Sequence, residues 1–240
     1  MGSLLRAVST IDNIETHTFF PEQLGPESIV VDFGANAGEF SRKVARRYGL
    51  RSFGVEANPE LYEKLKVVEA DPANRGRVKF FHYAISDKDE PVELHLSSES
   101  ITSSIASSAV PGARGATVVQ GRTLPTFLRE INVDRVDLLK CDIEGAEVGM
   151  FRTTSDNLLR RIGQITIEFH DYHGFHTLKE FEEMRDRLFS LGFGGIKFSP
   201  NNTNWLFYRN DMAGSARRTY VRHVVRNARG VLRRLGLRND

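Results

Sequence analysis

The sequence predicts an α/β fold in which helices cover both faces of a mostly parallel, doubly wound sheet. Three observations predict it. Short β-branched runs alternate with amphipathic runs, a glycine-rich turn joins the first strand to its helix, and polar residues gather where strands end. Such alternation with short connections is typical of parallel sheets with right-handed crossovers.

The first half of the chain repeats strand, turn and helix. Residues 1–27 contain two prolines and no clear strand, and are interpreted as a lead-in to the domain. The helix after the glycine turn is predicted from apolar residues that recur at helical spacing. The expected elements are a strand and helix within 28–49, a strand over 51–59, a helix over 60–70, a strand over 77–86 and an extra strand or hairpin arm over 91–97.

The second half resumes this alternation after a loop rich in Ser, Gly and Ala over 97–116. A loop of that length within a compact domain is either functional, such as a lid, or disordered. The last two strands are joined by "NNT" and read as a hairpin at the sheet edge. The expected elements are helix 124–131, strand 136–143, helix 147–160, strand 162–170, helix 177–193 and strands 194–201 and 203–209.

The composition is that of a soluble globular protein. The 240 residues suit one domain, and a single cysteine, Cys141, excludes an intrachain disulfide and a zinc site built from cysteines. No apolar stretch has the length of a membrane span, and the N-terminus lacks the apolar core of a signal peptide. The single cysteine, read as a buried and reduced thiol, favours a cytoplasmic location, with contact at the inner membrane surface left open.

The C-terminal tail carries most of the positive charge. From Ala216 to Asp240 there are eight Arg and one Asp, a local charge of +7 within a net charge of +2. Residues 216–238 are predicted to form a basic amphipathic helix that binds a membrane surface or partner, or packs on the acidic body. Nucleic acid is not an expected partner, because stacking aromatics are absent apart from Tyr220. The predicted division is lead-in 1–27, domain 28–212 and tail 213–240.

Two motifs in the first half indicate a nucleoside ligand. In "VDFGANAGEF", Gly34 and Gly38 flank a turn at a helix start, where backbone can approach a ligand closely. The acid Asp32 precedes this turn, and the spacing is not the dinucleotide pattern G-x-G-x-x-G. Glu56 stands at the end of the second strand, where a carboxylate can accept hydrogen bonds from two ribose hydroxyls.

A third motif, "KCDIEGAE", places three carboxylates at the end of an apolar strand. Ligands of doubly wound sheets bind beyond the carboxyl ends of the strands, which is where Asp142 is expected. Glu147 is interpreted as an acid of a first helical turn, which opposes the helix dipole favourably. Glu144 stays open between capping that helix and contacting the acceptor.

A fourth motif, "IEFHDYHGFH", brings titratable residues to the end of the next strand. His170 can remove a proton from a hydroxyl near neutral pH. The cluster also allows a metal, with Asp142 or Glu144 as further ligands, but its spacing matches no defined ligand motif and no metal ligand is assigned. The cluster consists of Glu168, His170, Asp171, His173 and His176.

Together these motifs resemble the FkbM family of S-adenosylmethionine-dependent methyltransferases. The resemblance covers about Ile29 to Phe169, and "DIEGAE" is its most specific part. It implies a class I methyltransferase (Rossmann-like) fold, with a seven-stranded sheet whose last strand is antiparallel, and S-adenosylmethionine as the cofactor. It also implies a sugar, glycan, glycolipid or other small molecule as the acceptor, with O-methylation of a hydroxyl as the leading prediction and a secondary metabolite as the alternative.

The resemblance also implies roles for individual residues. Asp142 would lie near the methionine amino group and the transferring methyl, and Glu56 would hold the ribose. The candidate base is His170, with Asp142 and Glu144 behind it. The other residues assigned to cofactor binding are Asp32, Gly34, Ala35, Asn36, Gly38, Asn58, Ile85 and Ser86.

Two rival functions remain open. An NAD-dependent enzyme could use a similar sheet, but it would leave the carboxylates of "KCDIEGAE" unexplained. A non-enzymatic module could use a methyltransferase-like fold to bind a membrane or partner.

Overall fold

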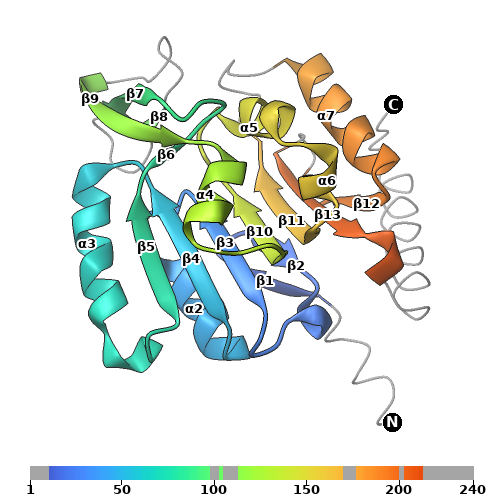
Figure 1. The fold of residues 1–240 in the computed structure, drawn as a ribbon, viewed down its shortest axis with the longest axis horizontal. Helices are drawn as coiled ribbons and strands as arrows, with labels where there is room; N and C mark the ends of the chain where they lie inside the picture. Colours follow the sequence, from blue (N-terminus) through green and yellow to red (C-terminus); the bar gives the residue numbers. More distant parts are fainter. Residues whose placement is uncertain (1–10, 98–102, 105–112, 170–176, 200–202, 213–240) are drawn as a thin grey trace, which may run out of the picture.

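The core of the protein is a seven-stranded sheet of mixed direction (Figure 1). The computed structural model describes residues 11–97, 103–104, 113–169, 177–199 and 203–212. Across the sheet the strands run in the order β12 (Phe193–Lys197), β13 (Asn204–Arg209), β11 (Ile162–Glu168), β10 (Val136–Cys141), β3 (Ile29–Phe33), β4 (Arg51–Glu56) and β5 (Val78–His82).

The strand directions confirm the predicted doubly wound class I arrangement. From β11 to β5 all neighbours are parallel, and β13 is antiparallel to both β11 and β12. In this register Lys140 lies between Asp32 on one side and Thr166 on the other. The carboxyl ends of β3, β4, β10 and β11 therefore meet at one edge, where ligands of such sheets bind.

Helices cover both faces of the sheet (Figure 1). One face packs against α4 (Leu124–Glu130), α5 (Glu147–Thr153), α6 (Asp156–Leu159) and α7 (Leu178–Ser190), with Phe33, Phe127 and Phe207 in its core. The other packs against α2 (Glu39–Tyr48) and α3 (Pro59–Ala70), with Val30, Leu138 and Leu206. The region 147–160 was predicted as one helix, which is wrong, because Ser155 caps a second helix and accepts a hydrogen bond from Leu158 N.

An N-terminal hairpin lies on the second face. Its strands are β1 (Asp12–Ile14) and β2 (His17–Phe19), so the expectation that residues 1–27 contain no strand is wrong. The strands are three residues each, and the turn uses Glu15 and Thr16 at positive φ rather than Gly or Asn, which hid the hairpin. Phe20 follows the hairpin fully buried, and its N–H donates to Gln164 Oε1 at 2.7 Å.

A second, smaller sheet lies beyond β5. Across this sheet the strands run in the order β6 (Ala84–Ile85), β9 (Ala113–Arg122), β7 (Pro91–Ser97) and β8 (Ser103–Ser104). The predicted strand 77–86 therefore divides between two sheets, and the extra strand 91–97 is confirmed as β7. The prediction missed β9, which falls partly in the segment assigned to the loop. Three single turns of 3-10 helix complete the described chain: η1 (Pro21–Gln23), η2 (Pro72–Asn74) and η4 (Asn210–Met212).

Some sequence-based expectations lie outside the described residues. These are His170 with most of its loop, the greater part of loop 97–116, and the basic tail. Among the helices that the structure does describe, none has the length and apolar character needed to cross a membrane.

Candidate functional site

A cavity that is open to solvent lies at the carboxyl edge of β3, β4 and β10. Tyr83 and Leu94, beyond the end of β5, contribute to its wall. Six of the residues that the sequence assigns to the site line it: Gly34, Asn36, Glu56, Ile85, Asp142 and Glu144.

The glycine turn is locked between the neighbouring strands. The N–H groups of Gly34 and Ala35 donate to Val55 O at 3.0 and 2.9 Å. Gly34 has φ +77°, and a Cβ there would lie 1.8 Å from the carbonyl oxygen of Asp142. Only glycine allows that approach of the turn to the loop after β10. Gly38 and Ala35 are not part of the lining; Gly38 precedes α2 in the left-handed conformation.

Glu56 presents a buried carboxylate to the cavity. It is 7% exposed, and its two oxygens accept the N–H groups of Asn36 and Asn58, each at 2.8 Å. Burial raises the pKa of Glu56, and these two hydrogen bonds oppose the rise. Because each carboxylate oxygen can accept a second hydrogen bond, Glu56 retains acceptors for a pair of ribose hydroxyls. The side chain of Asn58 itself caps α3, accepting from Glu60 N and Leu61 N.

Two further residues assigned to the cofactor, Asp32 and Ser86, are also buried and absent from the cavity lining. Asp32 is fully buried, with Oδ2 accepting from Ser41 Oγ at 2.7 Å and Oδ1 3.2 Å from Lys140 Nζ. Ser86 is 2% exposed, and its N–H donates to Arg122 O at 2.9 Å. In the structure both residues make contacts within the protein beside the site, with Asp32 held by Ser41 and Lys140 and Ser86 by Arg122.

Lys140 connects the strands that form the site. Its side chain is buried, with Nζ 3.2 Å from Asp32 Oδ1 and 3.6 Å from Asp142 Oδ2, and it also donates to Gly34 O. Burial alone would lower the pKa of Lys140, but the charges of Asp32 and Asp142 outweigh it and hold that pKa above its usual value. No role for Lys140 was predicted from the sequence, although the presence of a lysine within an apolar strand could have indicated one.

The loop after β10 is shaped by Glu147. As expected, this residue begins α5, but its carboxylate is fully buried and faces the preceding turn. It accepts the N–H groups of Ile143 at 3.2 Å and Gly145 at 3.0 Å. Glu144 has φ +50°, and its turn exposes it on the cavity lining. The three carboxylates thus divide, with Asp142 and Glu144 lining the cavity and Glu147 holding their loop.

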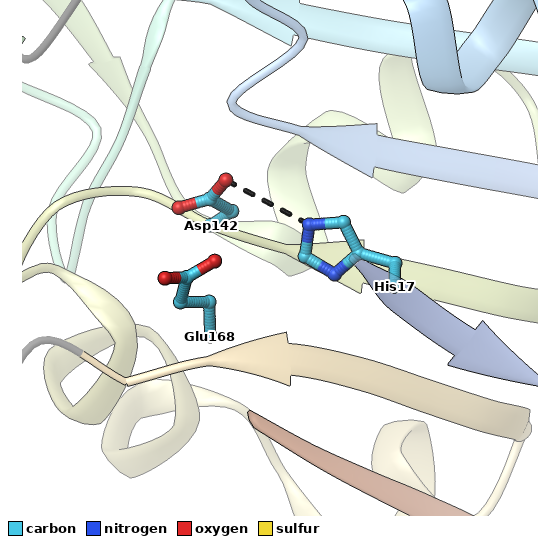
Figure 2. A group of neighbouring side chains, drawn as sticks. All are labelled: His17, Asp142 and Glu168. Carbon is cyan, nitrogen blue, oxygen red and sulfur yellow. Dashed lines mark ion pairs between the residues drawn. The ribbon is translucent and has the colours of Figure 1, made fainter. Parts of the chain in front are cut away.

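Next to the cavity, three titratable side chains converge from separate elements: His17 of β2, Asp142 after β10 and Glu168 at the end of β11. Figure 2 shows them pointing toward one another. His17 Nε2 lies 3.7 Å from Asp142 Oδ2, and one ligand-type atom from each residue lies within 4.8 Å of the others. Glu168 belongs to the predicted cluster. His17 was not predicted, because it lies far from Asp142 and Glu168 along the chain although the fold brings the three together.

Residues 32–194 match the family model described as the methyltransferase FkbM domain. The chain is 27% identical over 210 residues to AmbE of Pseudomonas aeruginosa, named AMB antimetabolite synthetase. That match covers 71% of this chain, and the chain spans about 10% of the length of AmbE.

Solved methyltransferase structures are also similar. Precorrin-6y C5,15-methyltransferase from Geobacter metallireducens matches with a TM-score of 0.44 and 12% identity, over 78% of this chain and 82% of that one. A methyltransferase from Geobacter sulfurreducens in complex with S-adenosyl-L-homocysteine gives a TM-score of 0.39 and 16% identity, over 73% and 61% of the two chains. Both TM-scores are below 0.5, so the assignment rests on the family match and on the strand order. The chain belongs to the FkbM family of methyltransferases, and its cofactor is S-adenosylmethionine.

Proposed function

We propose that the protein transfers a methyl group to a hydroxyl of a sugar, glycan or glycolipid. One observation carries the proposal: Glu56, Asp142 and Glu144 line one cavity beside the glycine turn. Such a pocket suits a cofactor with a ribose, an ammonium and a sulfonium. Its carboxylates are also placed to accept the proton of an acceptor hydroxyl. The acceptor class is proposed from the resemblance to the family alone.

The cofactor residues have separate roles in this proposal. Glu56 accepts the two ribose hydroxyls, while Gly34 and Asn36 surround the methionine part and Ile85 flanks the adenine. Asp142 lies at the sulfonium end, where its charge favours the cationic cofactor. Asp32 contributes indirectly, because its carboxylate holds Lys140, and Lys140 in turn lies beside Asp142.

S-adenosylmethionine would supply a methyl group on a sulfonium: the acceptor oxygen would bond to the methyl carbon, and S-adenosylhomocysteine would leave from the opposite side. The protein aligns the acceptor oxygen with that methyl, and alignment alone can account for much of the rate. A hydroxyl acceptor also loses its proton as the new bond forms. His170 is the first residue proposed to accept that proton, with Asp142 and Glu144 behind it.

A second candidate acceptor is a secondary metabolite. The relative AmbE is named an antimetabolite synthetase, which favours this class. For a glycolipid acceptor, the basic tail 216–238 would provide a membrane contact. The two acceptor classes require the same cofactor residues and differ in what enters the open mouth of the cavity.

The test is a transfer assay with methyl-labelled S-adenosylmethionine against panels of glycans, glycolipids and small hydroxylated metabolites. We expect label on a saccharide hydroxyl, located by mass spectrometry, and loss of transfer with Glu56→Ala. Label only on metabolites, or only on nitrogen or carbon, would contradict the proposal. Glu60→Ala is the matched control, because Glu60 is an exposed glutamate in the first turn of α3.

A further inference from the structure

We propose that His17, Asp142 and Glu168 form a binding site for one divalent cation with mixed nitrogen and oxygen preference, such as Mn²⁺. The site lies beside the cofactor cavity, and Asp142 belongs to both. No metal ligand is predicted from the sequence. The proposal differs from that prediction because the hairpin β1–β2 brings His17 next to the carboxylates of Asp142 and Glu168.

The spacing of the three side chains fits a shared ion. Their ligand atoms lie within 4.8 Å of one another. Ligands at about 2.1 Å from a metal lie about 3.0 to 3.4 Å apart when adjacent and about 4.2 Å apart when opposite. Small rotations of Asp142 and Glu168 would therefore complete the set, and one imidazole with two carboxylates suits Mn²⁺ or a similar ion.

His17 is already held in place as a ligand. It is 3% exposed, its ring meets Phe40 edge-on with centroids 5.7 Å apart, and its Nδ1 lies 3.5 Å from Thr166 Oγ1. This leaves Nε2 directed at Asp142 and Glu168 (Figure 2). A second contact that fixes the ring is typical of metal-binding histidines.

A direct ion pair explains the geometry less well. A protonated imidazole beside a carboxylate closes to about 2.7–2.9 Å, whereas Nε2 and Asp142 Oδ2 are 3.7 Å apart. That separation exceeds a hydrogen bond and matches two atoms that face a common centre.

The local charge also favours a divalent cation. Lys140 Nζ lies 3.2 Å from Asp32 Oδ1 and 3.6 Å from Asp142 Oδ2, so this lysine is closer to Asp32 than to the proposed site. The carboxylates of Asp142 and Glu168 converge beside the imidazole of His17, and carboxylate oxygens are preferred ligands of a divalent cation such as Mn²⁺.

The role of the ion rests on the proposed function. Coordination positions left open toward the cavity would take the acceptor hydroxyl and lower its pKa. The acceptor oxygen then forms its bond to the methyl as the carbon–sulfur bond breaks, and the hydroxyl proton passes to Glu144, a candidate base of the cavity lining that is not among the metal ligands. An acceptor with a second oxygen beside the first, as in sugars, could occupy two positions.

The test measures metal binding without any acceptor. The full chain is first stripped with a chelator and then titrated with Mn²⁺ alone, and the free ion is followed by electron paramagnetic resonance. We expect one Mn²⁺ per chain and a binding constant at least tenfold weaker in both His17→Ala and Glu168→Gln. His95→Ala is the control, because His95 lies on β7 in the separate small sheet.

Two results would overturn the proposal. One is the absence of stoichiometric Mn²⁺ binding by a folded wild-type chain, and the other is unchanged binding in Glu168→Gln, which keeps the shape of the side chain. If His17→Ala abolishes transfer while chelation does not, His17 acts as a base and the metal role is wrong. Metal binding that stands without any methyl transfer to hydroxyls would contradict only the proposed function.

Discussion

The two halves of the carboxyl edge differ in how the chain builds them. The half at β3 and β4 comes from one short stretch, in which Gly34 N–H donates to Val55 O and Asn36 N–H donates to the carboxylate of Glu56. The half at β10 and β11 combines His17, Asp142 and Glu168 from three distant segments. The first half is a local motif, and the second exists only once the hairpin packs on the sheet.

Lys140 connects the halves, and its removal should have the largest effect on stability. Lys140→Met leaves Asp32 buried without its cation, which costs about 3–5 kcal/mol. Urea unfolding measures the loss. Lys64→Met, on the exposed side of α3, should leave the midpoint unchanged, and equal midpoints for both variants would contradict the role of Lys140.

Breaking the first half alone should remove cofactor affinity without unfolding the protein. Glu56→Ala deletes two charge-assisted hydrogen bonds to the ribose, together about 3 kcal/mol, or roughly a 100-fold weaker S-adenosylhomocysteine complex. Calorimetric titration measures this affinity. A loss below threefold would mean that Glu56 does not contact the ribose.

Loosening the loop of the second half should cost less. Glu147→Gln replaces one of the two carboxylate oxygens that accept Ile143 N and Gly145 N, and we expect a loss of about 1–3 kcal/mol in unfolding free energy. Thermal unfolding compares it with Glu90→Gln, whose side chain is exposed. If the two variants melt alike, Glu147 is not what holds the loop.

The smallest effect is a pH dependence confined to the first half. Burial raises the pKa of Glu56 above its ordinary value of 4.5, so its protonation begins at a higher pH than for a free glutamate. Only the ionised form offers all its oxygens to the ribose, so S-adenosylhomocysteine affinity should fall as the pH drops toward that pKa. Titrations from pH 8 to pH 5 check this, and Glu56→Gln should show a flatter profile.

The sequence was sufficient for the first half because its information is local. The glycines, Glu56 and the strand-to-helix pattern lie within one continuous stretch, and the same alternation predicts a mostly parallel, doubly wound sheet. Ligands of doubly wound sheets bind beyond the carboxyl ends of the strands, and this rule also predicts that Asp142 and Glu144 line the cavity.

The second half could not be predicted in the same way. The hairpin of His17 has strands of three residues and a turn without Gly or Asn, so it left no signal. Asp32 was assigned to the ligand because its spacing does not reveal that Ser41 and Lys140 already hold it. Both cases depend on contacts between distant parts of the chain.

The central claim is that the two halves have separable tasks, with the cofactor bound by the first. S-adenosylhomocysteine titrations of Glu56→Ala and His17→Ala, side by side with the wild type, test it most directly. We expect Glu56→Ala to lose roughly 100-fold in affinity and folded His17→Ala to stay within about threefold of the wild type. Equal losses in the two variants would contradict the division.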